Sequence, residues 1–540
     1  MAFNIPPELM ASRIFTSQDH RLMAFKEGIT TTVTVHEVPG IDEHERLLST
    51  SGTGIAGDGD GIRSAQKTLG HLGPLLHPEA KTVLSVGFGA GETTECLVRH
   101  DIQAIDCVEI APELVDLALR YFNHINLGPK LYEHVRMIYM DAKNYLHLTD
   151  RRYDLILNDA DAPHNPGSAA LFTREHFTNA REQLNPGGLF ITKLHVNQIT
   201  RPAFNSVLGT FMEVFPHVTA WFPVSKPYMM VYLVGSVQPQ RFNLEKIREV
   251  MASDRVTESL SQMNVDTDTD FFSWYVGDKQ DIRNYLTAYR PNTDNCPFVE
   301  FYLGQEIVSD KSLLNEFMGK VRKHTAAGHI DWNGMNEAER QEWQTTSRNL
   351  YFLSSALLAS HTERNLMIRL QLVLSALKQK PANRALRDQE DKILGILRMN
   401  IHNGRIKPAA VHSVADTMLS DDPQNGAAWL LKSWAFKESN EIDQSMEAGL
   451  RAIGLSPLTA AAFESLGTLL IEKKEYRSAV DRFQQAVLLK PDAARLHYRL
   501  GAAYGYEGNL KDAFTAFREA LRINPNHRQA RMALSSGFSP

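Results

Sequence analysis

The feature that most constrains the fold is a regular alternation of short apolar runs and amphipathic segments between residues 82 and 194. The runs are rich in Val, Ile and Leu and have the length of buried strands. They cover residues 82–87, 104–110, 135–140, 153–158 and 188–194. Residues 112–125 and 171–184, which lie between runs, carry apolar residues at helical spacing. Strands that alternate with helices predict a parallel sheet covered on both faces, as in α/β Rossmann-like folds.

The sequence on either side of this alternation predicts antiparallel strands. Residues 29–38 read ITTTVTVHEV and residues 46–50 offer a partner strand, so we expect a small N-terminal β domain. Residues 218–224 and 228–236 are separated only by SKP, which predicts an antiparallel hairpin that closes the sheet. Residues 52–61 hold five glycines, so we expect a loop there.

A 34-residue repeat occupies the C-terminal part of the chain. Pro423, Pro457, Pro491 and Pro525 recur with this period, and matching helical segments lie between them. The units carry Leu-Gly in the first segment, Ala-Val or Ala-Phe in the second and Pro at the junction. In these respects they resemble the tetratricopeptide repeat, which implies an all-α solenoid with a binding face. Residues 345–420 are also helical in pattern but lack a clean period.

Composition excludes several classes of function. A net charge of −6 over 540 residues offers no basic footprint for nucleic acid or an anionic membrane. No apolar run approaches the ~18 residues of a membrane-spanning helix, and the N-terminal residues lack a leader pattern. Cys96, Cys107 and Cys296 lie far apart without a CxxC pair, so we expect a reducing compartment and no metal. These features predict a cytoplasmic protein without nucleic-acid or membrane partners.

The first predicted strand leads into a turn that suits a nucleotide ligand. Gly87, Gly89 and Gly91 lie in VGFGAGETT, where a strand gives way to a helix. Glycines at this point allow close approach of a ligand and expose amide N–H groups. The third glycine comes two residues after the second, so the turn departs from the dinucleotide fingerprint GxGxxG.

Acidic residues end the next two predicted strands. Glu109 ends the second strand, where a carboxylate can accept hydrogen bonds from the ribose hydroxyls of a nucleoside. The alternative is that Glu109 is simply a solvated acid at a strand end. Asp141, followed by Ala142, ends the third strand and suits the amino group of an adenine. Three successive strand ends with ligand-type residues predict a nucleoside site.

The glycine turn and the closing hairpin together resemble the class I S-adenosylmethionine fold. Residues 25–305 more specifically resemble the spermidine synthase, or polyamine aminopropyltransferase, family. The matching stretches are FKEGITTTVTVHE, GHLGPLLHPEAKTVLSVGFGAGETT, YDLILNDADAP, LFTREHF and NTDNCPFVEF. This resemblance implies a transferase of polyamine biosynthesis, which moves an aminopropyl or related alkyl group from decarboxylated S-adenosylmethionine to an amine. The nucleoside is then a co-substrate, and no metal is required.

Asp159 and Asp161 follow the fourth predicted strand in YDLILNDADAP. In the resembled family the first acid at this place is the proposed base for the attacking amine, and Asp159 and Pro163 match that motif. An amine with a pKa near ~10 arrives as an ammonium, which a carboxylate attracts, orients and deprotonates. Asp161 either replaces the family's second acid, expected at Ala162, or caps the loop through backbone N–H groups.

The chain departs from the family at two positions that would bind the donor's amine. Ala90 stands where the family has an acid, and Ala65 and Gln66 stand where it has a Tyr-His pair. Gln66 can still reach the donor's tail through hydrogen bonds. The donor is therefore open between decarboxylated and intact S-adenosylmethionine. His164 and Tyr228 are weaker candidates, since a solvated loop histidine and a packed core tyrosine are the commoner cases.

Three functions stay open from the sequence. The first is the aminopropyl-type transferase, the second an S-adenosylmethionine-dependent methyltransferase, and the third a non-catalytic nucleoside-binding scaffold. We expect a β-hairpin domain over 1–62, a catalytic domain over 63–305, a helical linker over 306–422 and tetratricopeptide repeats over 423–540. The expected partners are a small-molecule amine and a protein bound by the repeats, and a homodimer stays open.

Overall fold

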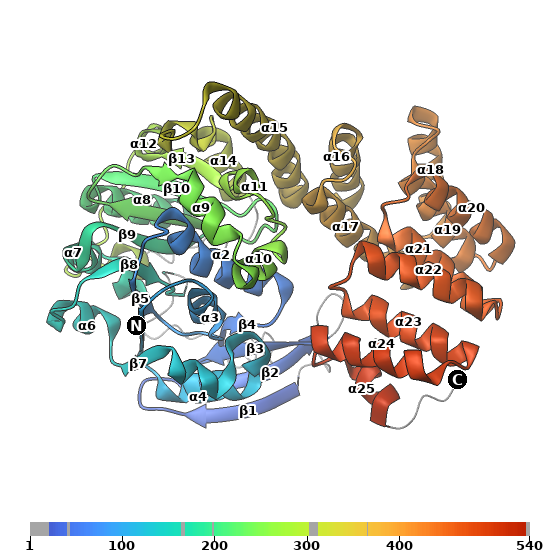
Figure 1. The fold of residues 1–540 in the computed structure, drawn as a ribbon, viewed down its shortest axis with the longest axis horizontal. Coiled ribbons are helices and arrows are strands. Elements are labelled where there is room, and N and C mark those ends of the chain that lie inside the picture. The colour runs from blue at the N-terminus through green and yellow to red at the C-terminus, as the bar shows by residue number, and fades with distance from the viewer. Residues whose placement is uncertain are drawn as a thin grey trace. The chain divides into compact units, whose positions relative to one another are not determined.

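A computed structural model describes residues 21–39, 44–161, 163, 168–196, 199–301, 312–363 and 365–535. The first compact unit of the chain ends at Thr362, and the second consists of His44 and the described residues from Glu363 onward (Figure 1). The boundaries expected for four domains stay a prediction. In the part of the chain that the structure describes, no helix is long and apolar enough to cross a membrane.

The first unit is built on an eight-stranded sheet with the order β13-β10-β11-β9-β8-β5-β6-β7. Its strands are β5 (Thr82–Val86), β6 (Ala104–Glu109), β7 (Val135–Tyr139), β8 (Tyr153–Asn158), β9 (Leu184–His195), β10 (His217–Trp221), β11 (Met230–Ser236) and β13 (Tyr275–Asp278). Strands β5 to β9 run parallel, and β10 and β11 form the predicted antiparallel hairpin. The predicted sheet is confirmed, and β13 is an edge strand that the sequence did not suggest.

Both faces of this sheet are covered. Leu155, Ile156 and Leu157 follow one another on β8 and are all fully buried, although successive side chains of a strand point to opposite faces. This is why the central strands read as continuous apolar runs.

The helices of the first unit connect and cover these strands. They are α2 (Asp60–Leu76), α3 (Glu92–Val98), α4 (Pro112–Tyr121), α5 (Asn123–Asn126), α6 (Ala142–Leu148), α7 (Arg174–Glu182), α8 (Arg201–Val214), α9 (Leu244–Met251), α10 (Asp254–Ser261), α11 (Asp268–Phe272), α12 (Lys279–Tyr285), α13 (Phe298–Phe301), α14 (Ser312–Val321) and α15 (Glu337–Thr362). Short 3-10 turns are η1 (Gly128–Glu133), η2 (Ala169–Phe172) and η3 (Ala326–His329), and β12 (Phe242–Asn243) pairs with β14 (Ile330–Asp331).

A small four-stranded sheet precedes the large one, as expected. Its strands, in the order β1-β2-β3-β4, are β1 (Arg21–Glu27), β2 (Thr32–Pro39), β3 (His44–Thr50) and β4 (Thr53–Gly57). The loop predicted over 52–61 is wrong, because β4 and the start of α2 fall within it. A Cβ atom on Gly54 would lie 2.9 Å from the Leu47 side chain, and one on Gly57 would lie 2.5 Å from the Arg46 carbonyl oxygen. These glycines therefore permit close strand packing rather than a loop.

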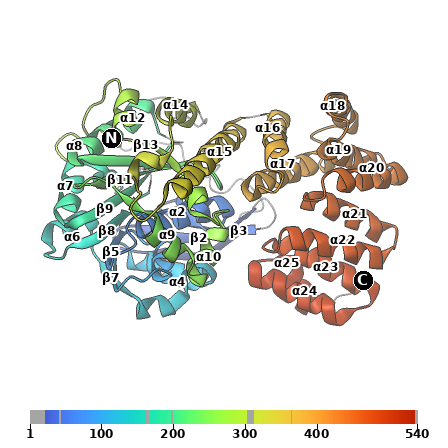
Figure 2. The same cartoon turned by 45° about the horizontal axis from the view of Figure 1, so that its top comes forward.

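From Glu363 onward, the described residues of the second unit form helices joined by short connections. Its helices are α16 (Leu366–Gln379), α17 (Arg384–His402), α18 (Pro408–Asp421), α19 (Gly426–Glu438), α20 (Ile442–Leu455), α21 (Ala460–Glu472), α22 (Tyr476–Leu489), α23 (Ala494–Glu507), α24 (Leu510–Ile523) and α25 (Arg528–Ser535). Helices α19 to α24 form three stacked pairs (Figures 1 and 2). A Cβ atom on Gly467 or Gly501 would lie within 3.0 Å of the Phe483 or Phe517 ring, which explains the repeated Leu-Gly. The predicted repeat array is confirmed.

The carboxyl group of Glu390 on α17 predicts pH-dependent stability of the second unit. Its side chain is fully buried, and burial raises the pKa of Glu390 to about 7 despite a 2.8 Å hydrogen bond from Arg387. Between the ordinary value of 4.5 and about 7 the folded state holds more protons than the unfolded state, so this group's contribution to stability is lost as pH rises. As the pH rises from about 4 to about 8, we expect the free energy of unfolding of Glu390→Gln to increase relative to that of the unchanged protein, by up to about 3 kcal/mol.

Urea unfolding at a series of pH values, with hydrogen exchange of α17 to localise the transition, measures this gain. Glu447→Gln serves as the matched control, because Glu447 is an exposed acid that pairs with Arg451 on its own helix. Stability curves of Glu390→Gln and the unchanged protein that run parallel with pH would contradict the prediction.

Candidate functional site

The glycine turn connects β5 to α3 as predicted. Gly87, Gly89 and Gly91 have φ angles of 89°, 55° and 86°, in the region that favours glycine. A Cβ atom on Gly91 would lie 2.6 Å from the Phe88 ring, and one on Gly87 would lie 3.1 Å from the carbonyl oxygen of Asp159. The turn and the first of the two acids after β8 are therefore in contact.

Glu109 lies at the end of β6 and supports this turn. Its Oε2 accepts a hydrogen bond from the Phe88 N–H, and its Oε1 accepts one from the Ala111 N–H, both at 3.0 Å. The side chain is only 8% exposed, so the alternative of a solvated acid is wrong. Burial raises the pKa of Glu109, while the N–H groups of Ala111, Phe88 and Ile110 oppose the shift. Each oxygen keeps a second lone pair for a ligand's hydroxyl groups.

Asp141 and Ala142 lie beside Glu109 at the same edge of the sheet. Tyr139 pairs with Glu109 across β6 and β7, and the Met140 N–H donates to the Glu109 carbonyl oxygen at 3.1 Å. Asp141 caps α6 by accepting a hydrogen bond from the Asn144 N–H at 2.9 Å. This half-buried carboxylate therefore has a structural role besides the predicted contact with an adenine.

The two acids after β8 each have a basic partner. Asp159 forms an ion pair with Lys193, and the two side chains are 6% and 9% exposed. The Oδ1 atom of Asp161 lies 3.9 Å from Nε2 of His195. Asp161 thus lies beside a histidine of β9. The sequence analysis had left two roles open for Asp161, the family's second acid or a cap of the loop. Ala162 and His164 lie outside the described residues.

Lys193 and His195 are site residues that the sequence analysis missed. Asn158 of β8 pairs with Thr192 of β9, so the residue after each, Asp159 and Lys193, meet at the strand ends. Lys193 and His195 are two residues apart and therefore share a face of β9. The available signal was a lysine within the predicted buried strand GLFITKL.

The three residues at the donor positions that depart from the family, Ala65, Gln66 and Ala90, are buried. Gln66 donates from Nε2 to the Gly57 carbonyl oxygen at 3.3 Å, and its Oε1 has no hydrogen-bond partner among the described residues. The carbonyl oxygen of Ala65 accepts a hydrogen bond from the Tyr232 hydroxyl at 2.8 Å. Ala90 is fully buried and places an apolar side chain in the glycine turn. Gln66 thus retains an acceptor for a polar ligand, whereas Ala65 and Ala90 offer no side-chain charge.

Tyr228 lies in the connection between β10 and β11 and packs against α2. A Cβ atom on Gly61 would lie 2.8 Å from its ring. Burial raises the pKa of Tyr228, and the neighbouring charge of Asp161 adds to the shift. Tyr228 is therefore buried against α2, where the charge of Asp161 influences its hydroxyl group.

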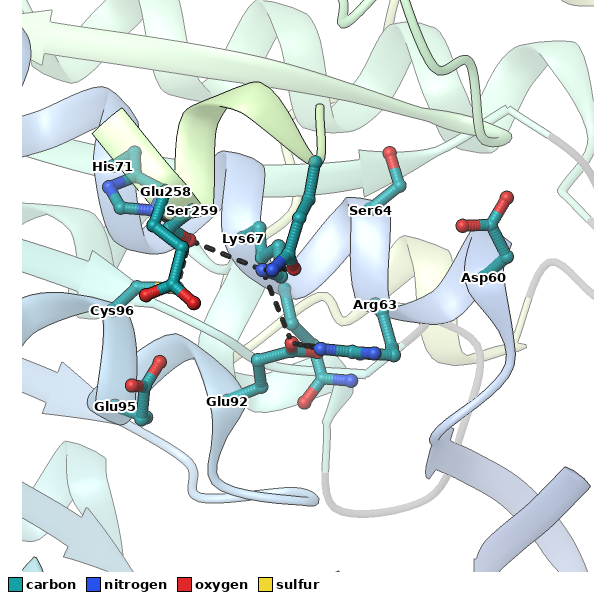
Figure 3. Close-up of polar contacts among 12 residues, drawn as sticks. Asp60, Arg63, Ser64, Lys67, His71, Glu92, Glu95, Cys96, Glu258 and Ser259 are labelled. Atoms are coloured by element: carbon teal, nitrogen blue, oxygen red, sulfur yellow. Dashed lines mark hydrogen bonds and ion pairs between the residues drawn. The ribbon is translucent and has the colours of Figure 1, made fainter. Parts of the chain in front are cut away.

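A network of largely buried charged side chains links α3, which follows the glycine turn, to α2 (Figure 3). Glu92, which follows Gly91, accepts hydrogen bonds from Nε and Nη2 of Arg63 at 2.9 and 2.8 Å. Lys67 lies 3.8 Å from the same carboxylate and donates to Ser259 and Gln262 at 3.2 and 2.6 Å. Burial lowers the pKa of Lys67 against the attraction of Glu92. The network joins α2, α3 and α10, and the sequence analysis did not predict it.

This architecture defines the class of the first unit. A sheet with parallel strands, a closing antiparallel hairpin, a glycine turn after the first parallel strand and an acid at the end of the second is the class I S-adenosylmethionine fold. Residues 63–245 match the family model of the spermine/spermidine synthase domain, and residues 494–527 match that of the tetratricopeptide repeat. The resemblance of both regions to these families is thereby confirmed.

Curated relatives carry the name polyamine aminopropyltransferase. The protein of Lachnoclostridium phytofermentans is 32% identical over 161 residues, which are 29% of this chain and 54% of the relative. That of Escherichia coli O1:K1 is 31% identical over 124 residues, which are 23% of this chain and 43% of the relative. The chain thus spans about half the length of the curated relatives it matches.

Solved structures of spermidine synthases are also similar to this chain. One, in complex with the transition state analogue AdoDATO, is 16% identical with a TM-score of 0.37, over 55% of this chain and 88% of that chain. The enzyme of Thermotoga maritima is 18% identical with a TM-score of 0.36, over 45% of this chain and 84% of that chain.

The contacts of Glu109 predict a loss of nucleoside affinity in Glu109→Gln. In glutamine, an NH2 group would replace one of the two carboxylate oxygens and would face the N–H of Phe88 or of Ala111. The hydrogen bond to that N–H would be lost, and the loss of a charge-assisted hydrogen bond costs about 1.5–3 kcal/mol. We expect the affinity for methylthioadenosine to fall at least about tenfold, as measured by calorimetry. The control is Asp101→Asn, because Asp101 is an exposed acid outside this edge. Unchanged affinity in a folded Glu109→Gln protein would contradict the prediction.

Proposed function

We propose that this protein transfers an aminopropyl or related alkyl group from a sulfonium nucleoside of the decarboxylated S-adenosylmethionine type to an amine. The observation that carries the proposal is the contact between Asp159 and the glycine turn. The Asp159 N–H donates to the Val86 carbonyl oxygen at 2.9 Å, and its own carbonyl oxygen lies against Gly87. A base and a nucleoside-binding edge therefore adjoin. The synthase domain and the names of the curated relatives support the same chemistry.

In this reaction Asp159 holds the acceptor amine and takes one of its protons. The nitrogen lone pair forms a bond to the carbon beside sulfur, and the carbon–sulfur bond breaks. The sulfur keeps the bonding electrons and leaves as a neutral thioether. Because no strong leaving-group assistance is needed, most of the rate enhancement comes from holding the two reactants in line.

Lys193 limits how strongly the site attracts a cationic acceptor. The ion pair with Lys193 already neutralises Asp159, so an ammonium must compete with this internal cation. Asp161, with His195 at its side, is the second carboxylate of the site. We therefore propose an acceptor that makes further contacts besides those of its charged amine.

Methyl transfer is the second candidate, and the buried Ala90 favours it. An apolar side chain at this position provides no charge for the ammonium of an aminopropyl donor. Mass analysis of the nucleoside product separates the two reactions, because aminopropyl transfer releases methylthioadenosine and methyl transfer releases S-adenosylhomocysteine. Binding of a nucleoside without either product, across a panel of amines, would support the scaffold.

Replacement of the base predicts a large loss of rate. With the best substrate pair, we expect Asp159→Asn to lower kcat about 10²- to 10⁴-fold, the usual contribution of a general base. Asp150→Asn, which changes an exposed acid at the far end of β8, should keep the full rate. The base assignment is wrong if Asp159→Asn turns over as fast as the unchanged protein.

Replacement of Lys193 predicts opposite changes in affinity and stability. In Lys193→Met the carboxylate of Asp159 is free to pair with the acceptor, so we expect a lower KM for a cationic amine. The same change leaves a buried carboxylate without its partner, which costs about 3–5 kcal/mol of stability. Steady-state kinetics and urea unfolding measure the two effects. A higher KM for the amine would instead mean that Lys193 itself assists acceptor binding.

A further inference from the structure

A cluster of arginines surrounds one carboxylate in the helical unit. Glu464, on α21, lies 3.0 Å from Nη1 of Arg398 on α17 and 3.0 Å from Nε of Arg499 on α23. Arg495, also on α23, pairs with the same oxygen. Glu464 is only 2% exposed, so the guanidinium groups cover it.

Among the described residues, the ion pairs of this cluster bring more than one arginine to a single carboxylate. Even with Arg495 left aside, Arg398 and Arg499 share one carboxylate. Burial would raise the pKa of Glu464, but the attraction of the three arginines outweighs it and holds the pKa well below the ordinary value. Burial lowers the pKa of Arg499, the attraction of Glu464 opposes this shift, and repulsion by Arg398 and Arg495 adds to it. An additional carboxylate would therefore be attracted to the cluster.

The arginines are accessible to such a ligand. The side chains of Arg398 and Arg499 are 30% and 36% exposed. Helices α21 and α23 are the first helices of two successive repeats and lie side by side, and α17 packs against α21. A guanidinium has donors on two edges, so it can hold Glu464 with one edge and a ligand's carboxylate with the other.

We propose that Arg398 and Arg499 form a docking site for an acidic segment of a partner protein. Side-chain carboxylates of that segment would pair with the outward edges of the guanidinium groups, in the bidentate geometry that arginine favours. A nucleic acid fits less well, because the chain as a whole carries a net charge of −6. The site lies in the second unit and is independent of the transferase proposal.

The probe is a fluorescein-labelled octaglutamate peptide, added to the full-length protein at about 50 mM salt and followed by anisotropy. We expect saturable binding, which the double variant Arg398→Gln/Arg499→Gln weakens at least about tenfold. The matched control is Arg451→Gln/Arg522→Gln, which removes the same charge from α20 and α24 and should bind normally. Circular dichroism and thermal unfolding show whether each variant is folded.

The outcome is decisive even if the double variant fails to fold. A photoreactive octaglutamate should then crosslink, in the unchanged protein, to peptides of α17, α21 or α23, as identified by mass spectrometry. The proposal is overturned if the crosslinks lie elsewhere, if octaglutamine or a single-stranded oligonucleotide binds as well as octaglutamate, or if a folded double variant binds normally.

Discussion

The burial of both faces of the central sheet is the constraint on which the rest of the first unit depends. Leu155, Ile156 and Leu157 occupy both faces of β8 with apolar side chains, so polar chemistry can only lie at the strand ends. Glu109 and Asp159 both lie at the carboxyl edge, one on each side of the glycine turn. The turn needs three residues with positive φ, and Glu109 holds it through the Phe88 N–H. A single edge thus combines a shaped backbone with two carboxylates.

At the same edge, two basic residues lie beside the acids, which would not be expected of a site that binds a simple diamine through its charges alone. Two free acids would attract a dication strongly, but Lys193 and His195 lie beside Asp159 and Asp161. An ion pair in a place that is less than a tenth exposed is weakly screened, so it competes effectively with an incoming ammonium. For the transferase that we propose, specificity for the acceptor would then come from contacts beyond charge, which would make the acceptor's shape more important than its number of amines.

The sequence predicted the parts of this protein that follow from local periodicity. Strands β5 to β9, the hairpin of β10 and β11, and the repeat helices all repeat a pattern along the chain, and each was confirmed. Gly54 and Gly57 misled the prediction, because glycine serves a loop and a crowded strand equally well, and only Leu47 and Arg46 reveal which applies. The pairing of Lys193 with Asp159 depends on the register between β8 and β9, which periodicity does not encode.

Two buried carboxylates, one in each unit, show how the surroundings of an acid separate support from recognition. Glu92 also lies between two cations, but Lys67 is buried and donates to Ser259 and Gln262, so its charge is satisfied internally. Burial also lowers the pKa of Lys67, which further reduces the positive charge around Glu92. Arg499 beside Glu464 remains about a third exposed, and a guanidinium keeps its charge at any pH that the fold survives. The first arrangement is therefore suited to fixing a turn, whereas the second keeps positive charge where an acidic partner can reach it.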